Sequence, residues 1–364
     1  MAVYMLTGFP GYLATNLIKE ISNQKAPIER LYLLYHPSVK KTADFERDRL
    51  VKESYLAEED VQLIEGDITK RCLGLSSSQS SSLLAEVTHF FHLAALYDLA
   101  APFLPSWRIN VDGTRNVLQW LEHSGNLQHF IYFSSAFVSG KRAGKIFEEE
   151  LKHHEGFKNH YEYTKYEAER LVQQYRALIP STIIRPGIVA GHSQTGETMK
   201  FDGPYFILNL LHLLRNLPLI PAFGRGEVYI NIVPQDYVTK AAAYLAHNKP
   251  SIHKTYHLTD PHPYTAHDLY HLFTKHYLGR EPAINLPLPF AQSALSLKSI
   301  RRLAGVQKQA LAYFTCESEY QQEQALADLN DARISCPDLK SYLPALVEYY
   351  SHQRKDAHKH LAIL

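Results

Sequence analysis

A glycine-rich turn near the N-terminus constrains the fold of this chain more than any other feature. Residues 7–14 read Thr-Gly-Phe-Pro-Gly-Tyr-Leu-Ala, between a short apolar strand at 2–6 and an amphipathic helix at about 12–22. Gly8 permits a tight turn, Gly11 lets a pyrophosphate approach the backbone, and Ala14 lets the helix pack closely on the strand. The helix N-terminus offers free N–H groups to phosphates. This context predicts a dinucleotide site made by Thr7, Gly8, Phe9, Pro10, Gly11, Tyr12 and Leu13.

The rest of the first half alternates short strand patterns with longer helical patterns. Further strands are expected at residues 31–35, 61–65, 89–93, 129–133 and 181–184, and helices at 110–124, 161–178 and 234–247. Alternation of this kind is typical of parallel sheets with helices on both faces. We therefore predict an α/β fold with a doubly wound parallel sheet of the Rossmann type.

The pattern changes after Arg185-Pro186-Gly187, where Gly, Pro and aromatic residues become frequent, and from residue 264 the chain reads as mostly helical. We expect residues 1–190, with about 232–248, to form an NAD(P)-binding domain. Residues 191–231 and 249–364 are expected to form a smaller, mostly helical substrate lobe. The apolar stretch at 205–221 contains polar residues that prevent it from crossing a bilayer. A core helix is favoured, with an acyl tunnel or a membrane-facing helix as alternatives.

Net charge and cysteine content limit the cellular location and the kinds of partner that we expect for this protein. The 364 residues carry a formal net charge of +1, so no strong field attracts nucleic acid or anionic lipid. Cys72, Cys316 and Cys336 lack metal-ligand spacing, and no signal peptide or transmembrane segment is recognised. These features predict a cytoplasmic protein with no metal site and no nucleic-acid partner.

The end of the second strand bears on the choice of dinucleotide. An acidic residue there commonly binds the ribose 2′-hydroxyl of NAD, but residues 35–41 contain no carboxylate. His36, Lys40 or Lys41 could instead meet a 2′-phosphate, so NADP(H) is preferred and NAD(H) is the alternative. Asp67, followed by Ile68, is placed after the third strand to accept from the adenine amino group.

A Tyr-x-x-x-Lys motif supplies the candidate chemistry. On a helix, Tyr161 and Lys165 lie on one face, where the ammonium would favour the phenolate and lower the pKa of Tyr161. A phenol tuned in this way can act as a general acid or base. Ser134 or Ser135, at the end of the preceding strand, could donate a hydrogen bond to the reacting oxygen.

At this point the chain resembles the extended short-chain dehydrogenase/reductase family. The resemblance is carried by TGFPGYLA, the Gly66-Asp67 step, HLAA at 92–95, NVDGT at 110–114, FSSAFVSG at 133–140, YEYTK and RPG. It selects Ser135, five residues before Gly140, as the active serine. It implies a structural or proton-relay role for Asn110 and a homodimer through the helices that carry Asn110 and Tyr161. It also places beside the cofactor Ala94, Ala95, Pro186, Gly187 and Ile188.

Within this family the chain looks most like the thioester-reductase and fatty-acyl-CoA-reductase branch. Residues 134–151, 185–206 and 231–238 carry that likeness. The branch often has Thr where this chain has Ser135, and Arg where it has His36. The resemblance implies an acyl-thioester or aldehyde substrate, reduced through a hemithioacetal to an aldehyde and then to an alcohol.

Two further interpretations stay open. The same residues could serve a sugar-nucleotide epimerase or dehydratase, or a hydroxysteroid dehydrogenase. A non-catalytic NAD(P)-binding sensor or scaffold is the alternative of another class, although it would not need Ser135, Tyr161 and Lys165. A serine hydrolase is excluded because no G-x-S-x-G motif surrounds Ser134 or Ser135.

Overall fold

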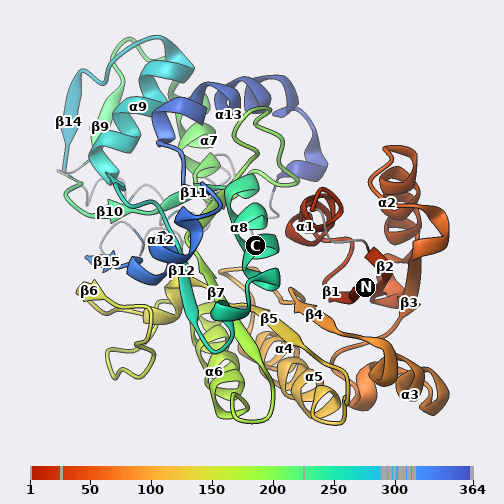
Figure 1. The fold of residues 1–364 in the computed structure, drawn as a ribbon. Coiled ribbons are helices and arrows are strands. Elements are labelled where there is room, and N and C mark those ends of the chain that lie inside the picture. The colour runs from red at the N-terminus through yellow and green to blue at the C-terminus, as the bar shows by residue number, and fades with distance from the viewer. Residues whose placement is uncertain are drawn as a thin grey trace.

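A computed structural model describes residues 2–24, 28–223, 226–287 and 317–360, together with Ser293, Leu297, Arg301, Gln309 and Tyr313. A parallel sheet of seven strands forms the centre of this described part, in the order β12-β7-β5-β4-β1-β2-β3 (Figure 1). Its strands are β1 (Ala2–Thr7), β2 (Ile28–Tyr35), β3 (Val61–Glu65), β4 (His89–His92), β5 (His129–Phe133), β7 (Ser181–Pro186) and β12 (Thr255–Leu258). The predicted doubly wound parallel fold is confirmed.

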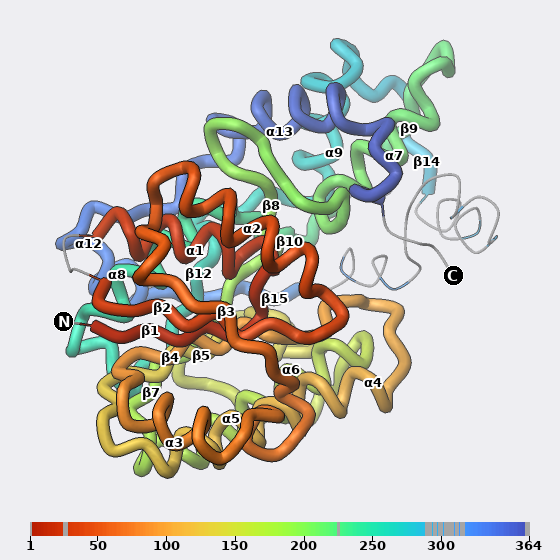
Figure 2. The backbone as a smooth tube through the Cα atoms, turned by 90° about the vertical axis from the view of Figure 1, so that its right-hand side faces the viewer, coloured from red at the N-terminus to blue at the C-terminus, as the bar shows by residue number. Residues whose placement is uncertain are grey.

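Alternation along the strands explains why helices cover both faces of the sheet. Tyr4 and Leu6 of β1 face one apolar cluster, whereas Val3 and Met5 face the other. Figure 2 shows the resulting layers, with α1, α2 and α8 on one side and α3, α5 and α6 on the other. The helices are α1 (Tyr12–Ser22), α2 (Lys40–Lys52), α3 (Ser77–Glu86), α4 (Phe103–Trp107), α5 (Gly113–Leu121), α6 (His160–Gln174) and α8 (Gln235–His247).

Strand β12 differs from the sequence-based prediction. Residues 255–258 were expected in the smaller lobe, but they pair in parallel with β7 and are buried throughout. Helix α12 (Glu323–Asn330) packs beside β12, and its Ala325 and Leu329 join the core on the α1 and α8 side. A four-residue strand that pairs with a segment some 70 residues earlier has little local signature. The late part of the chain therefore completes the nucleotide-binding domain as well as the second lobe.

The second lobe is built around α7 (Tyr205–Leu214), α9 (Ala266–Leu278) and α13 (Leu339–Gln353), which share one apolar core. Short two-stranded sheets accompany these helices: β8 (Ile188–Ala190) with β11 (Ile232–Pro234), β9 (Pro221–Phe223) with β14 (Ile284–Leu286), and β10 (Tyr229–Ile230) with β13 (Tyr264–Thr265). A further pair, β6 (Gly144–Ile146) with β15 (Ser318–Tyr320), lies beside β12 and α12. Residues 205–209 and Leu211 of α7 are buried, and Phe206 and Ile207 also line the cavity described below, so this helix serves both as core and as cavity wall.

Leu208 of α7 provides a test of this second core. Its side chain is fully buried, so Leu208→Ala removes apolar contacts and leaves a cavity. We expect the free energy of unfolding to fall by about 2–5 kcal/mol in a denaturant titration. The control is Leu326→Ala, whose side chain is 49% exposed and should change stability by less than about 0.5 kcal/mol. Equal losses in the two variants would contradict the burial of α7.

Candidate active site

A cavity of about 1220 Å³ lies where the carboxyl ends of the central strands meet the second lobe. The glycine turn follows β1, next to β4, where the order of strands along the sheet reverses, and ligands of open α/β sheets bind at such positions. Most of the residues predicted for the site line this cavity: Gly8, Phe9, Pro10, Gly11, Tyr12, Leu13, His36, Asp67, Ile68, Ala94, Ala95, Ser135, Tyr161, Lys165, Pro186, Gly187 and Ile188. Thr7, Lys40 and Asn110 are not among the lining residues.

The glycine turn forms a cradle that a larger residue would fill. Gly8 has a φ of +88°, and a Cβ there would lie 2.8 Å from the backbone nitrogen of Ala94. The N–H of Gly11 donates to the carbonyl oxygen of Gly8 over 2.7 Å, and a Cβ on Gly11 would lie 2.7 Å from that oxygen. No side chain caps the N-terminus of α1. The backbone is therefore free to approach phosphate groups, as a dinucleotide requires.

Thr7 lies behind this cradle. Its hydroxyl is hydrogen-bonded to Nδ1 of His92 over 2.7 Å and accepts from the N–H of Ala94 over 3.3 Å. The side chain is fully buried. Thr7 thus fixes the turn against β4 and does not face the cavity.

Asp67 and His36 lie close together on the cavity wall, where the sequence predicts that the adenine and the 2′-phosphate bind. Although burial opposes the change, hydrogen bonds from Thr69 lower the pKa of Asp67. Its Oδ2 lies 3.9 Å from Nε2 of His36. Lys40 turns away, because its ammonium donates to the hydroxyl of Tyr35 over 3.4 Å. Ser38, which the sequence reasoning missed, lines the cavity and is hydrogen-bonded to His36 over 2.7 Å.

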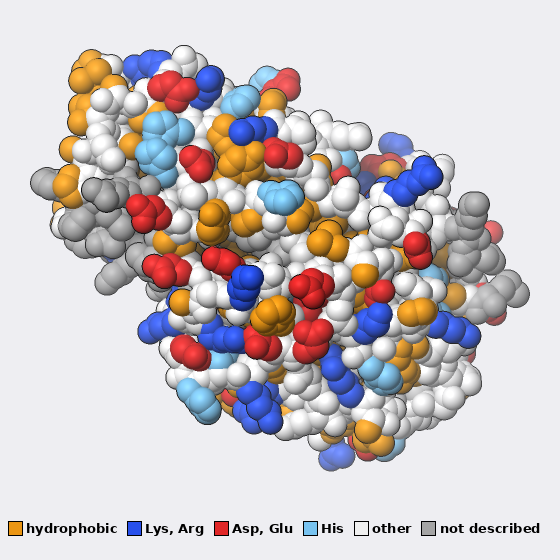
Figure 3. Space-filling model, turned by 60° about the vertical axis from the view of Figure 1, so that its left-hand side comes forward, with side chains coloured by type: hydrophobic (Ala, Val, Ile, Leu, Met, Phe, Trp, Pro, Cys, Tyr) orange, Lys and Arg blue, Asp and Glu red, His pale blue; other side chains and the backbone are white. Residues whose placement is uncertain are grey.

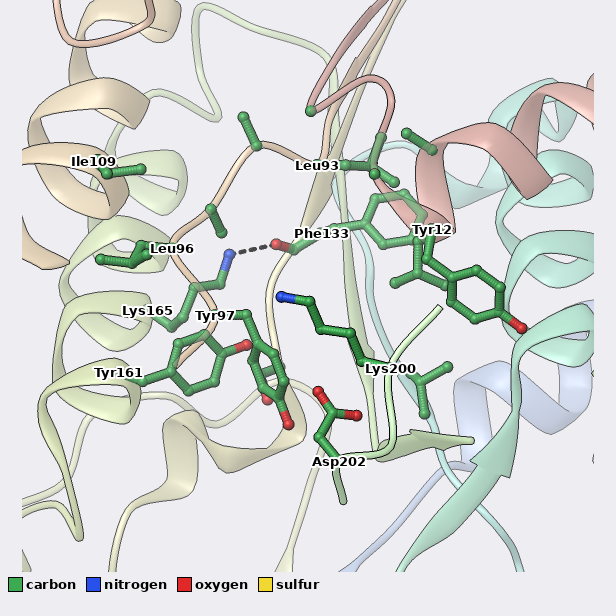
Figure 4. Close-up of a pocket in the computed structure, with 18 of the residues that line it drawn as sticks. Tyr12, Leu93, Leu96, Tyr97, Ile109, Phe133, Tyr161, Lys165, Lys200 and Asp202 are labelled. Atoms are coloured by element: carbon green, nitrogen blue, oxygen red, sulfur yellow. Dashed lines mark hydrogen bonds between the residues drawn. The ribbon is translucent and has the colours of Figure 1, made fainter. Parts of the chain in front are cut away.

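The three candidate catalytic side chains come together on one wall of the cavity. Asn159 caps α6, and Tyr161 and Lys165 follow in its first turns on one face of the helix. Ser135 lies just past the end of β5 and is hydrogen-bonded to the phenol of Tyr161. The ammonium of Lys165 donates to the carbonyl oxygen of Phe133 over 2.5 Å, as Figure 4 shows. A carbonyl placed beside Tyr161 would therefore meet two hydroxyl donors.

The pKa prediction for Tyr161 is wrong in direction. Burial raises the pKa of Tyr161 to about 12, although the hydrogen bond with Ser135 lowers it. Burial also lowers the pKa of Lys165 to about 7, while Glu169 raises it. Loss of water thus favours the neutral form of each group, and this outweighs the predicted effect of the ammonium on the phenol. The phenol is set up to hold its proton and donate it.

Asn110 supports the site from behind. It lies in a π-helical segment, Arg108–Asp112, between α4 and α5. Its side chain accepts from the N–H of Leu96 over 2.8 Å and donates to the hydroxyl of Thr164 over 2.9 Å. These contacts join the cavity-lining segment at 94–97 to α6, and they match the structural role among the two expected for Asn110.

The sequence analysis did not identify three polar residues, Tyr97, Lys200 and Asp202, that also line the cavity. The ring of Tyr97 packs edge-on against Tyr161, with centroids 5.1 Å apart. Lys200 and Asp202 come from the loop before α7 and point into the same space (Figure 4). Burial raises the pKa of Asp202 to about 6, against the effect of Lys200. The sequence did contain a signal for Lys200 and Asp202, because they are two charged residues close together in a stretch rich in Gly and Pro.

The surface carries no single-sign field on the face in Figure 3, where acidic and basic side chains are interspersed. Among the described residues, no helix is long and apolar enough to cross a membrane, and no three potential metal ligands lie together. Cys72 and Cys336 are free thiols, whereas Cys316 lies outside the described residues.

A family model described as male sterility protein, an NAD-binding family, matches residues 6–242. The chain belongs to this family. It is an extended short-chain dehydrogenase/reductase of the thioester-reductase-like branch, and hence an enzyme that uses a nicotinamide cofactor. The cradle at Gly8 and Gly11 fits such a cofactor.

Several of the proteins to which the chain is similar are reductases or reductase domains. It is 24% identical over 319 residues to alcohol-forming fatty acyl-CoA reductase of Simmondsia chinensis, covering 67% of this chain and 63% of that protein. It is 26% identical over 273 residues to fatty acyl-CoA reductase wat of Drosophila melanogaster, covering 65% and 52%. The solved terminal R domain of the myxalamid biosynthetic pathway is 25% identical, with a TM-score of 0.81 and coverage of 97% and 91%. The chain thus spans less than two thirds of the length of these two curated relatives.

Replacement of Gly8 tests the cradle. Gly8→Ala adds a Cβ against the backbone of Ala94 at a positive φ, and strain of this kind costs about 1–3 kcal/mol. We expect the dissociation constant for NADPH, measured by fluorescence titration, to rise about 5- to 150-fold. The control is Gly125→Ala, where a Cβ meets no atom within 4 Å and affinity should not change. Unaltered binding in Gly8→Ala would place the dinucleotide elsewhere.

Proposed function

We propose that this protein is an NADPH-dependent reductase of acyl thioesters and of the aldehydes they yield. One observation carries the proposal: Ser135, Tyr161 and Lys165 converge on a mostly apolar cavity that runs from the glycine turn into the second lobe. The similarity to fatty acyl-CoA reductases supports the same substrate class.

Different residues along the cavity would hold the different parts of the dinucleotide. Gly8, Gly11 and the start of α1 would hold the pyrophosphate, and Asp67 the adenine. When bound, the nicotinamide supplies the hydride. Pro186 to Ile188, at the junction of β7 and β8, would lie beside the nicotinamide, and Lys165 would reach its ribose.

The protonation states favour reduction. Negative charge develops on the substrate oxygen as its carbonyl carbon is reduced, and hydroxyl donors stabilise such charge. Tyr161 keeps its proton near neutral pH, because burial raises its pKa to about 12. It can therefore transfer that proton to the developing oxyanion while Ser135 donates a second hydrogen bond. Lys165, in its ammonium form, stabilises the phenolate that remains.

The apolar wall favours an acyl chain over a sugar. Its aliphatic and aromatic side chains come from the segment at 93–109, from α7 and from the strands of the second lobe, and include Leu96, Leu99, Ile109, Phe206, Ile207 and Ile230. Leu104, at 76% exposure, also lines the cavity, and apolar surface there suits the entry of a hydrocarbon chain. A sugar nucleotide would leave most of its hydroxyls without partners on this wall.

Replacement of Tyr161 tests the chemistry. Tyr161→Phe removes the proton donor and keeps the ring, so kcat for reduction of an acyl-CoA by NADPH should fall by about 10²- to 10⁴-fold. Affinity for NADPH should be retained, as measured by fluorescence titration. The control is Tyr163→Phe on the same helix, which should retain activity, since Tyr163 does not line the cavity. Loss of activity equal in both variants would argue against a specific proton donor.

The preference for NADPH rests on His36 and Ser38. His36→Asp places a carboxylate where the 2′-phosphate is expected. Since exposed charge pairs contribute up to about 1 kcal/mol, we expect binding of NADPH to weaken by up to about fivefold, with binding of NADH unchanged or tighter. Lys40→Ala is the matched control and should not alter either affinity, because Lys40 contacts Tyr35 instead. Parallel weakening of both dinucleotides by His36→Asp would contradict a role at the 2′-phosphate.

A homodimer through the helices that carry Asn110 and Tyr161, and a cytoplasmic location, stay predictions. Their test is the mass of the protein in solution and its position in fractionated cells.

A further inference from the structure

A fully buried carboxylate lies directly behind the catalytic face. Glu169 of α6, one turn after Lys165, accepts from the hydroxyl of Ser134 over 2.5 Å. Both of its oxygens accept from Nε of Arg185 at 3.1 Å, and Oε1 also accepts from Nη2 at 2.6 Å. A carboxyl group that accepts this many hydrogen bonds is the ionised, acceptor-only form. Neither Glu169 nor Arg185 lines the cavity.

The remaining donors of Arg185 are also used. Its Nη1 donates to the carbonyl oxygen of Glu148 over 3.2 Å and to Nε2 of His257 over 3.1 Å. His257 in turn donates from Nδ1 to the carbonyl oxygen of Gln321 over 2.7 Å. The guanidinium is therefore fixed on every side, and it holds Glu169 in one position.

Glu169 connects the three elements that carry the active groups. Ser134 precedes Ser135 at the end of β5, Lys165 lies one turn earlier on α6, and Arg185 precedes Pro186 at the end of β7. We propose that Glu169 is a positioning residue that sets Ser135 and Pro186 relative to α6 and keeps Lys165 in its charged form. This inference does not depend on the identity of the substrate.

The surroundings of Lys165 explain why it needs a counterion. Its ammonium meets the carbonyl oxygen of Phe133 and lies 4.5 Å from the centroid of the Tyr132 ring. His92 of β4 is neutral near pH 7, because burial lowers its pKa to about 3. Tyr161 faces Lys165 as an uncharged phenol, and Lys200 and Asp202 point into the same space (Figure 4). Glu169 is the carboxylate that raises the pKa of Lys165, against the stronger effect of burial.

If the Glu169–Arg185 ion pair served stability alone, we would expect a different experimental result from the one expected for a role in the site. Buried pairs can often be replaced by neutral residues, so a loss of stability would not show a role in the site. The charge state of Lys165 does distinguish the two, because loss of the charge on Glu169 lowers the pKa of Lys165, whereas looser packing admits water and raises it. Lys165 lines the cavity, so small reagents can reach its amine.

The test measures the titration of Lys165 directly, in the full chain without dinucleotide. Reductive methylation by formaldehyde and borane attacks the neutral amine, and peptide mass spectrometry gives its rate at Lys165 as a function of pH. In Glu169→Gln we expect the midpoint to fall by about one pH unit or more. Because Lys165 must be charged, the high-pH limb of kcat/KM should move to lower pH by a similar amount. A midpoint equal to that of the unmodified chain would overturn the proposal.

Three further variants keep the test decisive. Glu169→Asp retains the charge and should restore most of the midpoint while positioning is impaired. Ser134→Ala removes one hydrogen bond and keeps the charge, so it should lower kcat without moving the midpoint. Glu167→Gln removes a carboxylate from the same helix that pairs with Arg170 over 2.9 Å, and should change neither. If Glu169→Gln does not fold, Glu169→Gln with Arg185→Gln leaves no unpaired buried charge and is judged by the same shift.

Discussion

The removal of water from ionisable groups at the carboxyl edge of the sheet is the constraint on which the site depends. Tyr161, Lys165 and Ser135 are all nearly buried, and burial favours the neutral form of both the phenol and the amine. In a protein interior, each charge therefore needs a partner at short range. A site that must hold an ammonium beside a neutral phenol can do so only where the fold places a carboxylate near the ammonium and hydrogen-bond donors around that carboxylate. Helix α6 supplies the carboxylate of Glu169, and the ends of β5 and β7, which meet α6 at one edge of the sheet, supply the donors Ser134 and Arg185 that hold it.

The parts of this arrangement that are local in sequence could be predicted. The glycine turn follows from Gly8 and Gly11 between a strand and a helix, and the pair Tyr161 and Lys165 follows from their spacing of four residues. Six of the strands in the central sheet follow from short apolar runs. Each of these features is decided by neighbouring residues, and the structure has them where the sequence placed them.

The parts of the arrangement that depend on contacts between distant segments of the chain could not be predicted from the sequence. Strand β12 has four residues and is recognisable only through its pairing with β7. Lys40 is close to His36 in sequence, yet the hydroxyl of Tyr35 draws its ammonium away from the cavity. The direction of the pKa change at Tyr161 was wrong because spacing on a helix reveals a neighbouring cation but not the depth of burial. Tyr97 packs against Tyr161, and Asp202 enters the same cavity, from segments that no local pattern connects.

The two lobes therefore contribute different kinds of constraint. The sheet fixes the reacting groups through buried polar contacts, which tolerate little displacement because each lost partner leaves a charge or a donor unsatisfied. The second lobe contributes mainly apolar side chains from α7 and its strands, and apolar contacts are far less directional. Such a division lets the chemistry stay constant while the length and shape of the substrate are set elsewhere. Asp202 and Lys200 are the exception, because they bring charge from the loop before α7 into the reacting space. A substrate of the proposed reaction would have to accommodate those two groups as well as the apolar wall, so in this proposal the loop that carries them would couple the selection of substrate to the carboxyl edge of the sheet.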